Sequence, residues 1–246
     1  MDDPRQHAGE HRVRFDECGA GGTMRPSALL RAVQDLAWQH SIAAGFERDW
    51  YRERGLTWLV RFVDLRMGRG VASGSTLRMR TSITGLRRVW ARRETVIWEG
   101  TATTPAAGTT IDWVIVDTQG RPVRVPEEIV RGFGQEAPTF TPARVHLSHP
   151  QSEPVVDPWT VGVRDLDPMA HVNNATYLDI MDEVLAGAAG TLIGPLPPVH
   201  YELEYLRSAM PRSVVSVRHW AEGSASTFQL TAEDGSELIR GRVQPG

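Results

Sequence analysis

Two carboxylates, an imidazole and two adjacent carboxamides lie within the short segment Asp165–Asn174. A carboxylate can take a proton from water or attack a carbonyl carbon directly. Apolar residues at helical spacing follow the segment, and the N–H groups at a helix start can stabilise developing negative charge. The segment therefore predicts an acid–base or hydrolytic site at the start of a helix, whose apolar stripe consists of Tyr177, Ile180, Met181, Val184, Leu185 and Ala188.

A second copy of this pattern, without its reactive groups, lies near the N-terminus. Residues 17–35 align with residues 165–183 without a gap. Pro26 favours a helix start, and Gly45 is suited to the end of that helix. Gly19 stands at the position of Asp167, and Thr23 at the position of His171, so the first copy cannot perform the same acid–base chemistry. We expect a duplicated fold with one complete site.

Each copy is expected to contain one long helix followed by antiparallel strands. Short extended leads, at residues 13–15 and 161–163, precede the two loops. The chain between the copies, residues 136–159, is rich in proline and small polar residues and is expected to be a linker. One helix covered by a curled sheet is an α+β layout, and the strands are expected at residues 57–67, 75–84, 90–98, 109–118, 199–206, 214–221, 227–232 and 237–243.

Composition excludes several classes of protein. The chain has 246 residues, of which 41% are hydrophobic, which is enough for a sizeable core. Its net charge is −3, which does not favour binding to nucleic acid. No apolar run approaches the roughly 20 residues of a membrane span, and the polar start lacks a signal-peptide core, so a cytoplasmic protein is expected. Cys18 is the only cysteine and lysine is absent, which excludes an intrachain disulfide, a multi-cysteine zinc site and a lysine Schiff base. No metal or cofactor is expected.

Taken together, these residues resemble the acyl-ACP thioesterases of plants and bacteria, in which two hotdog folds are fused. The resemblance rests on the Asp-x-Asp-Pro loop with His171-Val-Asn-Asn-x-x-Tyr177, and on four further segments: Arg25–Arg31, Gly55–Arg61, Trp113–Arg124 and Leu203–Arg207. It covers about residues 11–243. It implies a tandem hotdog fold, with an N-terminal domain over residues 1–135 that helps to bind the acyl chain and a C-terminal domain over 160–246 that carries the catalytic motif.

The resemblance implies hydrolysis of a fatty-acyl or polyketide thioester on acyl carrier protein or coenzyme A. Asp167 would be the base or nucleophile, and His171 would assist it or hold the loop. Met169 replaces the family's asparagine, and Ser208-Ala209 replaces its Glu-Cys pair; methionine cannot orient water as an amide does. Two other classes therefore stay open: a dehydratase, cyclase or acyl-transfer enzyme on a carrier-bound chain, and a non-catalytic acyl-carrier binding protein.

The remaining polar residues of the motif have structural as well as functional interpretations. Asn173 and Asn174 are expected to cap the helix and hold the loop rather than to touch substrate. Ser208 could hydrogen-bond a water, but a hydroxyl is a poor base without a partner. Glu183 could be a helical base or an ordinary surface glutamate. Asp165 is expected to be structural, because alternate residues of an extended loop point to opposite sides.

Arginine pairs and tryptophans in the first copy offer contacts with a substrate or a partner. Arg87, Arg88, Arg92 and Arg93 could contact an acidic carrier protein or the phosphate of its phosphopantetheine arm, or could simply discourage pairing at a sheet edge. A homodimer is compatible with the sequence. Five tryptophans could line an acyl tunnel or pack in the core: Trp38, Trp58, Trp90, Trp98 and Trp113.

Overall fold

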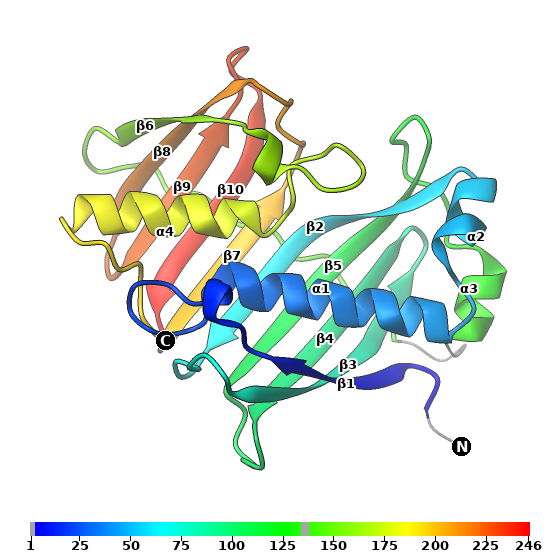
Figure 1. The fold of residues 1–246 in the computed structure, drawn as a ribbon. Coiled ribbons are helices and arrows are strands. Elements are labelled where there is room, and N and C mark those ends of the chain that lie inside the picture. Colours follow the sequence, from blue (N-terminus) through cyan, green and yellow to red (C-terminus); the bar gives the residue numbers. More distant parts are fainter. Residues whose placement is uncertain (1–2, 134–137) are drawn as a thin grey trace.

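The computed structural model describes residues 3–133 and 138–246. Within them, ten strands form one antiparallel sheet, and two long helices lie against one of its faces (Figure 1). The helices are α1 (Pro26–Ala43), α4 (Thr176–Ala188) and the shorter α2 (Arg48–Glu53) and α3 (Glu127–Gly132). The strands are β1 (Gln6–Arg12), β2 (Leu56–Met67), β3 (Thr76–Arg87), β4 (Trp90–Glu99), β5 (Ala107–Asp117), β6 (Val155–Thr160), β7 (Val199–Tyr205), β8 (Val214–Glu222), β9 (Ala225–Thr231) and β10 (Glu237–Pro245).

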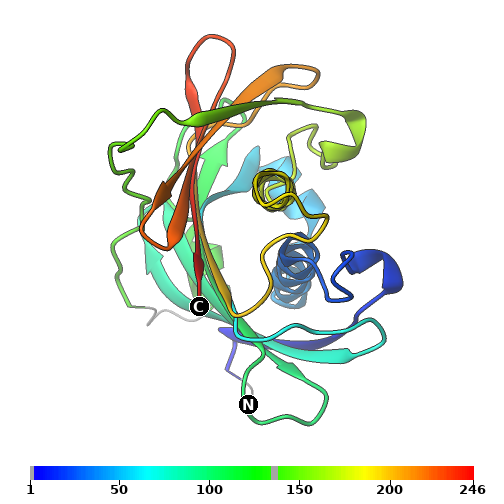
Figure 2. The ribbon, with the colours of Figure 1, turned by 90° about the vertical axis from the view of Figure 1, so that its left-hand side faces the viewer.

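The two halves of the chain contribute equivalent halves of the sheet. The strand order is β1-β3-β4-β5-β2-β7-β10-β9-β8-β6, so that the central strands β2 and β7 join the halves. These two strands pair antiparallel from Phe62 opposite Glu204 to Met67 opposite Val199. Viewed end-on, α1 and α4 lie next to one another inside the curve of the sheet (Figure 2). The predicted α+β layout, with each helix wrapped by antiparallel strands, is confirmed.

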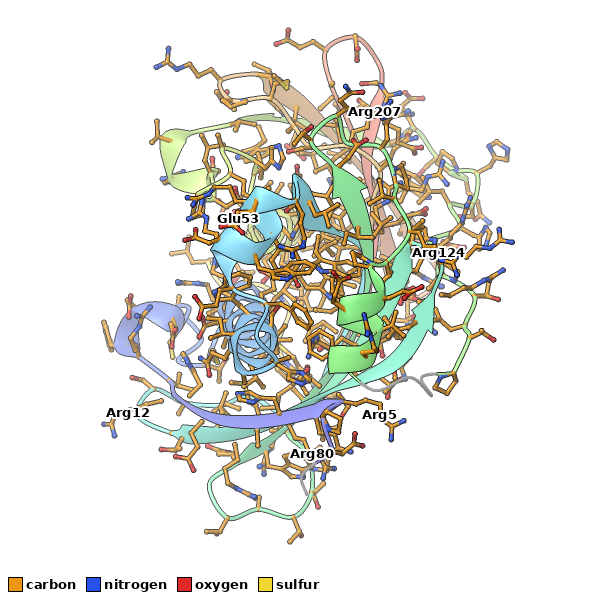
Figure 3. All side chains as sticks on the ribbon, turned by 90° about the vertical axis from the view of Figure 1, so that its right-hand side faces the viewer. Arg5, Arg12, Glu53, Arg80, Arg124 and Arg207 are labelled. Atoms are coloured by element: carbon orange, nitrogen blue, oxygen red, sulfur yellow. The ribbon has the colours of Figure 1, made fainter. Side chains whose placement is uncertain are left out.

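The two long helices are held by apolar faces directed at the sheet. Pro26 begins α1, where its missing N–H costs nothing, and Gly45 ends it with a φ of +87°. In α4 the side chains of Tyr177, Leu178 and Met181 are at most 1% exposed. Burial of each such side chain contributes about 1.5–3 kcal/mol to folding. Side chains fill the space between the helices and the sheet (Figure 3). Of the arginines labelled there, Arg12, Arg80, Arg124 and Arg207 are exposed on the outside.

The structure corrects several boundaries expected from the sequence. All eight strands expected after the helices are present. The leads expected at 13–15 and 161–163 are not strands, because β1 and β6 end just before them. Short 3-10 turns begin at the last residue of each lead, at Phe15–Glu17 and Val163–Asp165. Residues 155–159 of the expected linker belong to β6. The expected start of the linker, at residue 136, lies outside the described residues. Helices α2 and α3 were not expected, since six residues are too short to show helical periodicity.

The described part of the linker crosses the face of the sheet that points away from the helices. The Val145 N–H donates to the buried Glu204 carboxylate at 3.1 Å, and the Ala143 N–H donates to Asp112 at 2.9 Å. These bonds satisfy buried carboxylates that would otherwise be costly. Among the described residues, no helix is long and apolar enough to cross a membrane.

Candidate active site

The segment between β6 and α4 closes into a loop around Asp167. The Oδ1 atom of Asp167 accepts hydrogen bonds from the backbone N–H of Met169 at 2.8 Å and of His171 at 3.1 Å. The Asp167 N–H donates to the His171 carbonyl at 2.8 Å. Oδ2 has no protein partner in the described part of the chain. One carboxylate oxygen therefore fixes the orientation of the group, and the other is available to a ligand.

The first copy of the motif repeats this loop without its carboxylate. The Gly19 N–H donates to the Thr23 carbonyl at 2.9 Å, as Asp167 does to His171, and a bridge between Cys18 and Met24 matches that between Leu166 and Val172. Equivalent residues are 148 positions apart, as the gapless alignment predicted. The loop that contains Asp167 is therefore one of two equivalent loops, and Gly19 removes the reactive group from the other.

The Asp167 loop lies at the wall of an apolar cavity inside the first half of the molecule. The cavity has a volume of about 520 Å³, within the range of small-molecule sites. Asp167, Pro168 and Met169 form part of its lining, and the remaining lining comes from α1, α2, α3 and the neighbouring strands. Trp38, Trp58 and Trp113 line the cavity, whereas Trp90 and Trp98 do not. The lining also includes Ala37, Tyr51, Ile83, Leu86, Ala91, Ile129 and Phe133.

A few polar groups interrupt this apolar lining. Arg93 is 8% exposed and donates through Nη1 to His40 Nδ1 at 2.7 Å and to the Thr81 hydroxyl at 3.3 Å. Burial, reinforced by the Arg93 charge, lowers the pKa of His40 to about 4, so its ring accepts at Nδ1 and donates from Nε2 to the Pro4 carbonyl. Burial lowers the pKa of Arg93 to about 10. Arg93 is therefore a charged group at the wall of the cavity.

The structure places the other predicted site residues around the Asp167 loop. His171 is exposed, and its backbone N–H, rather than its imidazole, contacts Asp167. The expectation that Asn173 or Asn174 caps the helix is wrong, because the N-cap of α4 is Ala175. The Asn173 carboxamide oxygen accepts from the Ala175 N–H at 2.9 Å, and the Asn174 carbonyl accepts from the Tyr205 hydroxyl at 3.0 Å, so both hold the loop. The exposed Ser208 hydroxyl contacts only the Ala209 carbonyl, at 3.3 Å, among the described residues.

Met169 lines the cavity from the Asp167 loop. Its side chain is 44% exposed, and its sulfur accepts from the Thr57 hydroxyl at 3.7 Å. Asp165, in contrast, is buried and accepts from the Gly162 N–H at 2.7 Å, which is a structural role. Tyr177, expected in the core, is 1% exposed.

Comparison with known families gives a decisive match over most of the chain. Residues 4–133 match the acyl-ACP thioesterase N-terminal domain, and residues 148–244 match the acyl-ACP thioesterase C-terminal domain. The chain belongs to the acyl-ACP thioesterase family. Its enzyme class, thioester hydrolase, follows from this membership. A search of curated protein sequences returns no match.

Solved structures of acyl-ACP thioesterases have the same fold. An acyl-ACP thioesterase from Bacteroides thetaiotaomicron is 14% identical, with a TM-score of 0.82 and 99% of each chain covered. The 12:0-ACP thioesterase from Umbellularia californica is 20% identical, with a TM-score of 0.80 and coverage of 97% of this chain and 96% of the other. The resemblance seen in the sequence and the double hotdog fold are therefore confirmed.

The arginine pairs of this family member are mostly engaged within the protein. Arg92 makes two hydrogen bonds to the fully buried Asp112, at 2.7 and 2.8 Å, and Arg93 is buried beside the cavity. Arg87 donates to the Phe140 carbonyl of the linker at 3.0 Å. The placement of Arg92 and Arg93 gives them a structural explanation. Arg88, exposed and with a φ of +51°, is the member of the set that the described contacts leave free for a partner.

One group of described side chains has donor atoms close enough to hold a metal ion. It consists of Asp64, His200 and Glu202 on β2 and β7. His200 Nε2 bonds Asp64 at 3.0 Å, Gln244 bonds His200 Nδ1 at 2.9 Å, and Arg66 makes two further bonds to Asp64. The cavity beside Asp167 is on the opposite face of the sheet, and Asp64 and His200 are already hydrogen-bonded to each other and to their neighbours.

Sequence reasoning missed two polar residues on the helices. Gln34 of α1 lines the first cavity, and Asp182 of α4 lines a second pocket. Glu183, the glutamate that the sequence singled out on α4, is exposed at the rim of that second pocket. A signal was present: Gln34 and Asp182 each interrupt an apolar stripe, and they occupy equivalent positions in the gapless alignment.

Proposed function

We propose that this acyl-ACP thioesterase family member hydrolyses a carrier-bound acyl thioester at the mouth of the first cavity. The observation that carries the proposal is the position of Asp167, whose free Oδ2 lies on a loop that lines an apolar cavity. The acyl chain, fatty or polyketide, would lie among Trp38, Trp58 and Trp113, and its thioester would stop beside the loop. Burial of the chain supplies the binding energy.

In this proposal the Asp167 carboxylate takes a proton from water while the water oxygen attacks the thioester carbon. The carbon–sulfur bond then breaks, the electron pair leaves with sulfur, and the exposed His171 imidazole supplies the proton that makes it a thiol. Direct attack by Asp167 would instead form a mixed anhydride. In a single turnover in ¹⁸O-labelled water, label in Asp167 identifies direct attack, because it arises only when water opens the anhydride at the aspartyl carbon.

The proposed role of Asp167 does not depend on Met169 or Ser208. Two backbone N–H groups, rather than a neighbouring amide or glutamate, hold the carboxylate in place. We propose that this fixed orientation compensates for the replaced family residues. The carrier would approach from the side of the exposed Arg88.

The test is thiol release from a panel of acyl-ACP and acyl-CoA substrates, with intact-protein mass spectrometry of the carrier. Equal amounts of free acid and free thiol are expected, and the ratio of kcat/KM for ACP and CoA substrates gives the carrier preference. A carrier that keeps a dehydrated or cyclised chain would overturn the proposal in favour of another carrier-dependent enzyme. Tight binding without turnover would instead indicate a binding protein.

A further inference from the structure

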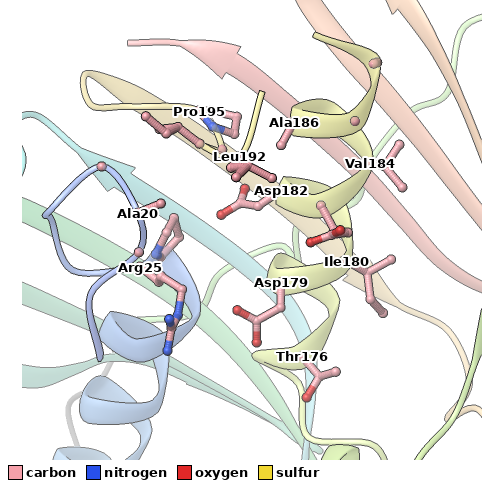
Figure 4. Close-up of a pocket in the computed structure, with 18 of the residues that line it drawn as sticks. Ala20, Arg25, Thr176, Asp179, Ile180, Asp182, Val184, Ala186, Leu192 and Pro195 are labelled. Atoms are coloured by element: carbon pink, nitrogen blue, oxygen red, sulfur yellow. The ribbon is translucent and has the colours of Figure 1, made fainter. Parts of the chain in front are cut away.

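A second pocket lies between the two repeats, and we call it the inter-repeat cleft. It has a volume of about 1150 Å³. The loop Gly19–Gly21 and the start of α1 form one wall, while α4 and the segment Leu192–Pro197 form the other (Figure 4). Figure 4 shows Asp179 and Asp182 on the side of α4 that faces Ala20 and Arg25.

The inter-repeat cleft lies beside the loop of the first copy, just as the first cavity lies beside the equivalent Asp167 loop of the second copy. In the second copy, the N–H groups of Met169 and His171 bind the Asp167 carboxylate. The equivalent N–H groups in the first copy belong to Gly21 and Thr23, and both residues line the cleft. Because Gly19 has no side chain, these two N–H groups form no hydrogen bond within the described structure. They are a pair of donors suited to a carbonyl oxygen or an anion.

A carboxylate lies on the other wall of the cleft. Asp182 lines it at the position where α1 has Gln34, and its Oδ1 accepts from the Tyr201 hydroxyl at 2.7 Å. Burial, with a smaller effect from the Asp179 charge, raises the pKa of Asp182 to about 7. A carboxyl group with this pKa can both accept and donate a proton near neutral pH.

The segment Leu192–Pro197 contacts both the Gly19–Gly21 loop and α4. A Cβ atom on Gly21 would lie 3.1 Å from Leu196 and 3.2 Å from Ile193, and one on Gly194 would lie 3.0 Å from the Asp182 Cβ. Leu192, Ile193 and Leu196 are 91%, 39% and 54% exposed, and so present apolar surface at the cleft. Donors, a carboxylate and an apolar surface therefore meet around one space.

We propose that the inter-repeat cleft is a second acyl-thioester site, in which Gly21 and Thr23 bind the carbonyl oxygen and Asp182 is the acid–base residue. The Asp182 carboxylate takes a proton from water as the water oxygen attacks the thioester carbon. The carbon–sulfur bond breaks, and Asp182 returns the proton to the departing sulfur. The products are a free acid and a free thiol, so the step needs no other reactant.

Other charged groups face the cleft and are mostly paired. Asp179 is hydrogen-bonded to Ser27 and to Arg31, the latter at 3.0 Å, and the Arg25 guanidinium donates to the carbonyls of Cys18 and Asp16. The remaining groups are Asp157 with His219, at 3.4 Å, and Asp165, Arg164 and Glu183. Among the described residues that line the cleft, Asp182, bonded to the neutral Tyr201, and the exposed Glu183 are the carboxyl groups without a cationic partner, and Asp182 is the less exposed of the two.

The first test measures hydrolysis in an Asp167→Asn background, which suppresses the first site. Asp182→Asn keeps an oxygen to accept from Tyr201 but cannot take a proton. The Asp167→Asn variant is expected to retain slow thiol release that rises across an inflection near pH 7. The double variant is expected to be at least 10-fold slower and to lose the inflection. Equal rates in the two variants, or no release by Asp167→Asn above the buffer rate, would overturn the proposal.

The second test counts binding sites with an acyl-pantetheine ketone in which a methylene group replaces the sulfur. Two molecules per chain are expected for the wild type by calorimetry. Ala20→Trp, an exposed change at the wall of the cleft, should remove one, and Ala91→Leu in the first cavity should weaken the other when the acyl chain of the ketone is long enough to reach residue 91. One site in the wild type, or no effect of Ala20→Trp, would also overturn the proposal. Full activity of Asp167→Asn would instead contradict the role proposed for the first cavity.

Discussion

Gln34 of α1 and Asp182 of α4 occupy equivalent positions in the two repeats, and each lines a pocket next to the loop of the other repeat. Gln34 lines the first cavity together with Asp167, and Asp182 lines the inter-repeat cleft together with Gly19. The first cavity has its carboxylate on the loop, whereas in the inter-repeat cleft the residue at the position of Gln34 is a carboxylate on the helix. The duplication has produced two different arrangements of acid–base groups around the same pair of loops.

The first prediction concerns Asp167. Asp167→Asn should reduce kcat/KM about 100- to 1000-fold, since removal of a general base costs about 10²–10⁴-fold. The carboxamide oxygen can still accept from Met169 and His171, so the melting temperature should change little. Thiol release and thermal unfolding measure the two effects. Asp35→Asn, an exposed change on α1, is the control and should leave both unchanged; a similar loss there would show that the effect is nonspecific.

The second prediction separates the side chain of His171 from its backbone. Because its N–H holds Asp167, His171→Ala should preserve the loop and remove only the imidazole. If the imidazole protonates the departing sulfur, kcat should fall about 100-fold for an alkyl thioester. The fall should be much smaller for an aryl thioester, whose thiolate leaves without a proton. Equal losses for both substrates would indicate a structural histidine.

The sequence alone was sufficient for the repeat alignment, because the loop and the helix that follows it have the same length in both copies. The two loops share few residue types, yet the structure shows the same backbone hydrogen bonds in both. Gly19 and Asp167 could be equated without a structure because of the equal lengths. The position of Asp182 could not be predicted, since its burial depends on Tyr201 and on the segment Leu192–Pro197, both distant in sequence. The pairing of Arg92 with Asp112 was missed for the same reason: it joins β4 to β5 beneath the linker.

The third prediction concerns the size of the first cavity. Ala91 is 8% exposed and lines the cavity from β4. Ala91→Leu should shift the preferred acyl chain to a shorter length, because the added carbon atoms occupy space that the chain would use. Overpacking should cost about 1–3 kcal/mol of stability. Relative kcat/KM over a chain-length series measures the shift, and Ala8→Leu on the exposed face of β1 is the matched control. An unchanged length preference would mean that the chain lies elsewhere.

The fourth prediction links Asp182 to stability. The pKa of Asp182 in the folded protein, about 7, lies above its ordinary value of 3.8. Between these pH values the folded protein binds a proton that the unfolded chain does not, so the free energy of unfolding falls as the pH rises from about 4 to 7. Asp182→Asn should therefore raise the melting temperature at pH 8 and have little effect at pH 4.5. The same shift at both pH values would contradict the assigned pKa.

The fifth prediction distinguishes structural arginines from one that could bind the carrier. Arg92→Met leaves the fully buried Asp112 carboxylate without its cation, and loss of one partner of a buried pair costs about 3–5 kcal/mol. Urea unfolding should show this loss.

Arg88→Ala removes an exposed charge, so the stability of the protein should be unchanged. KM should rise for acyl-ACP but not for the same acyl group on pantetheine, because pantetheine lacks the acidic protein that Arg88 would contact. A parallel rise for both substrates would place Arg88 at the thioester end of the substrate, and an unchanged KM for acyl-ACP would mean that the carrier binds elsewhere.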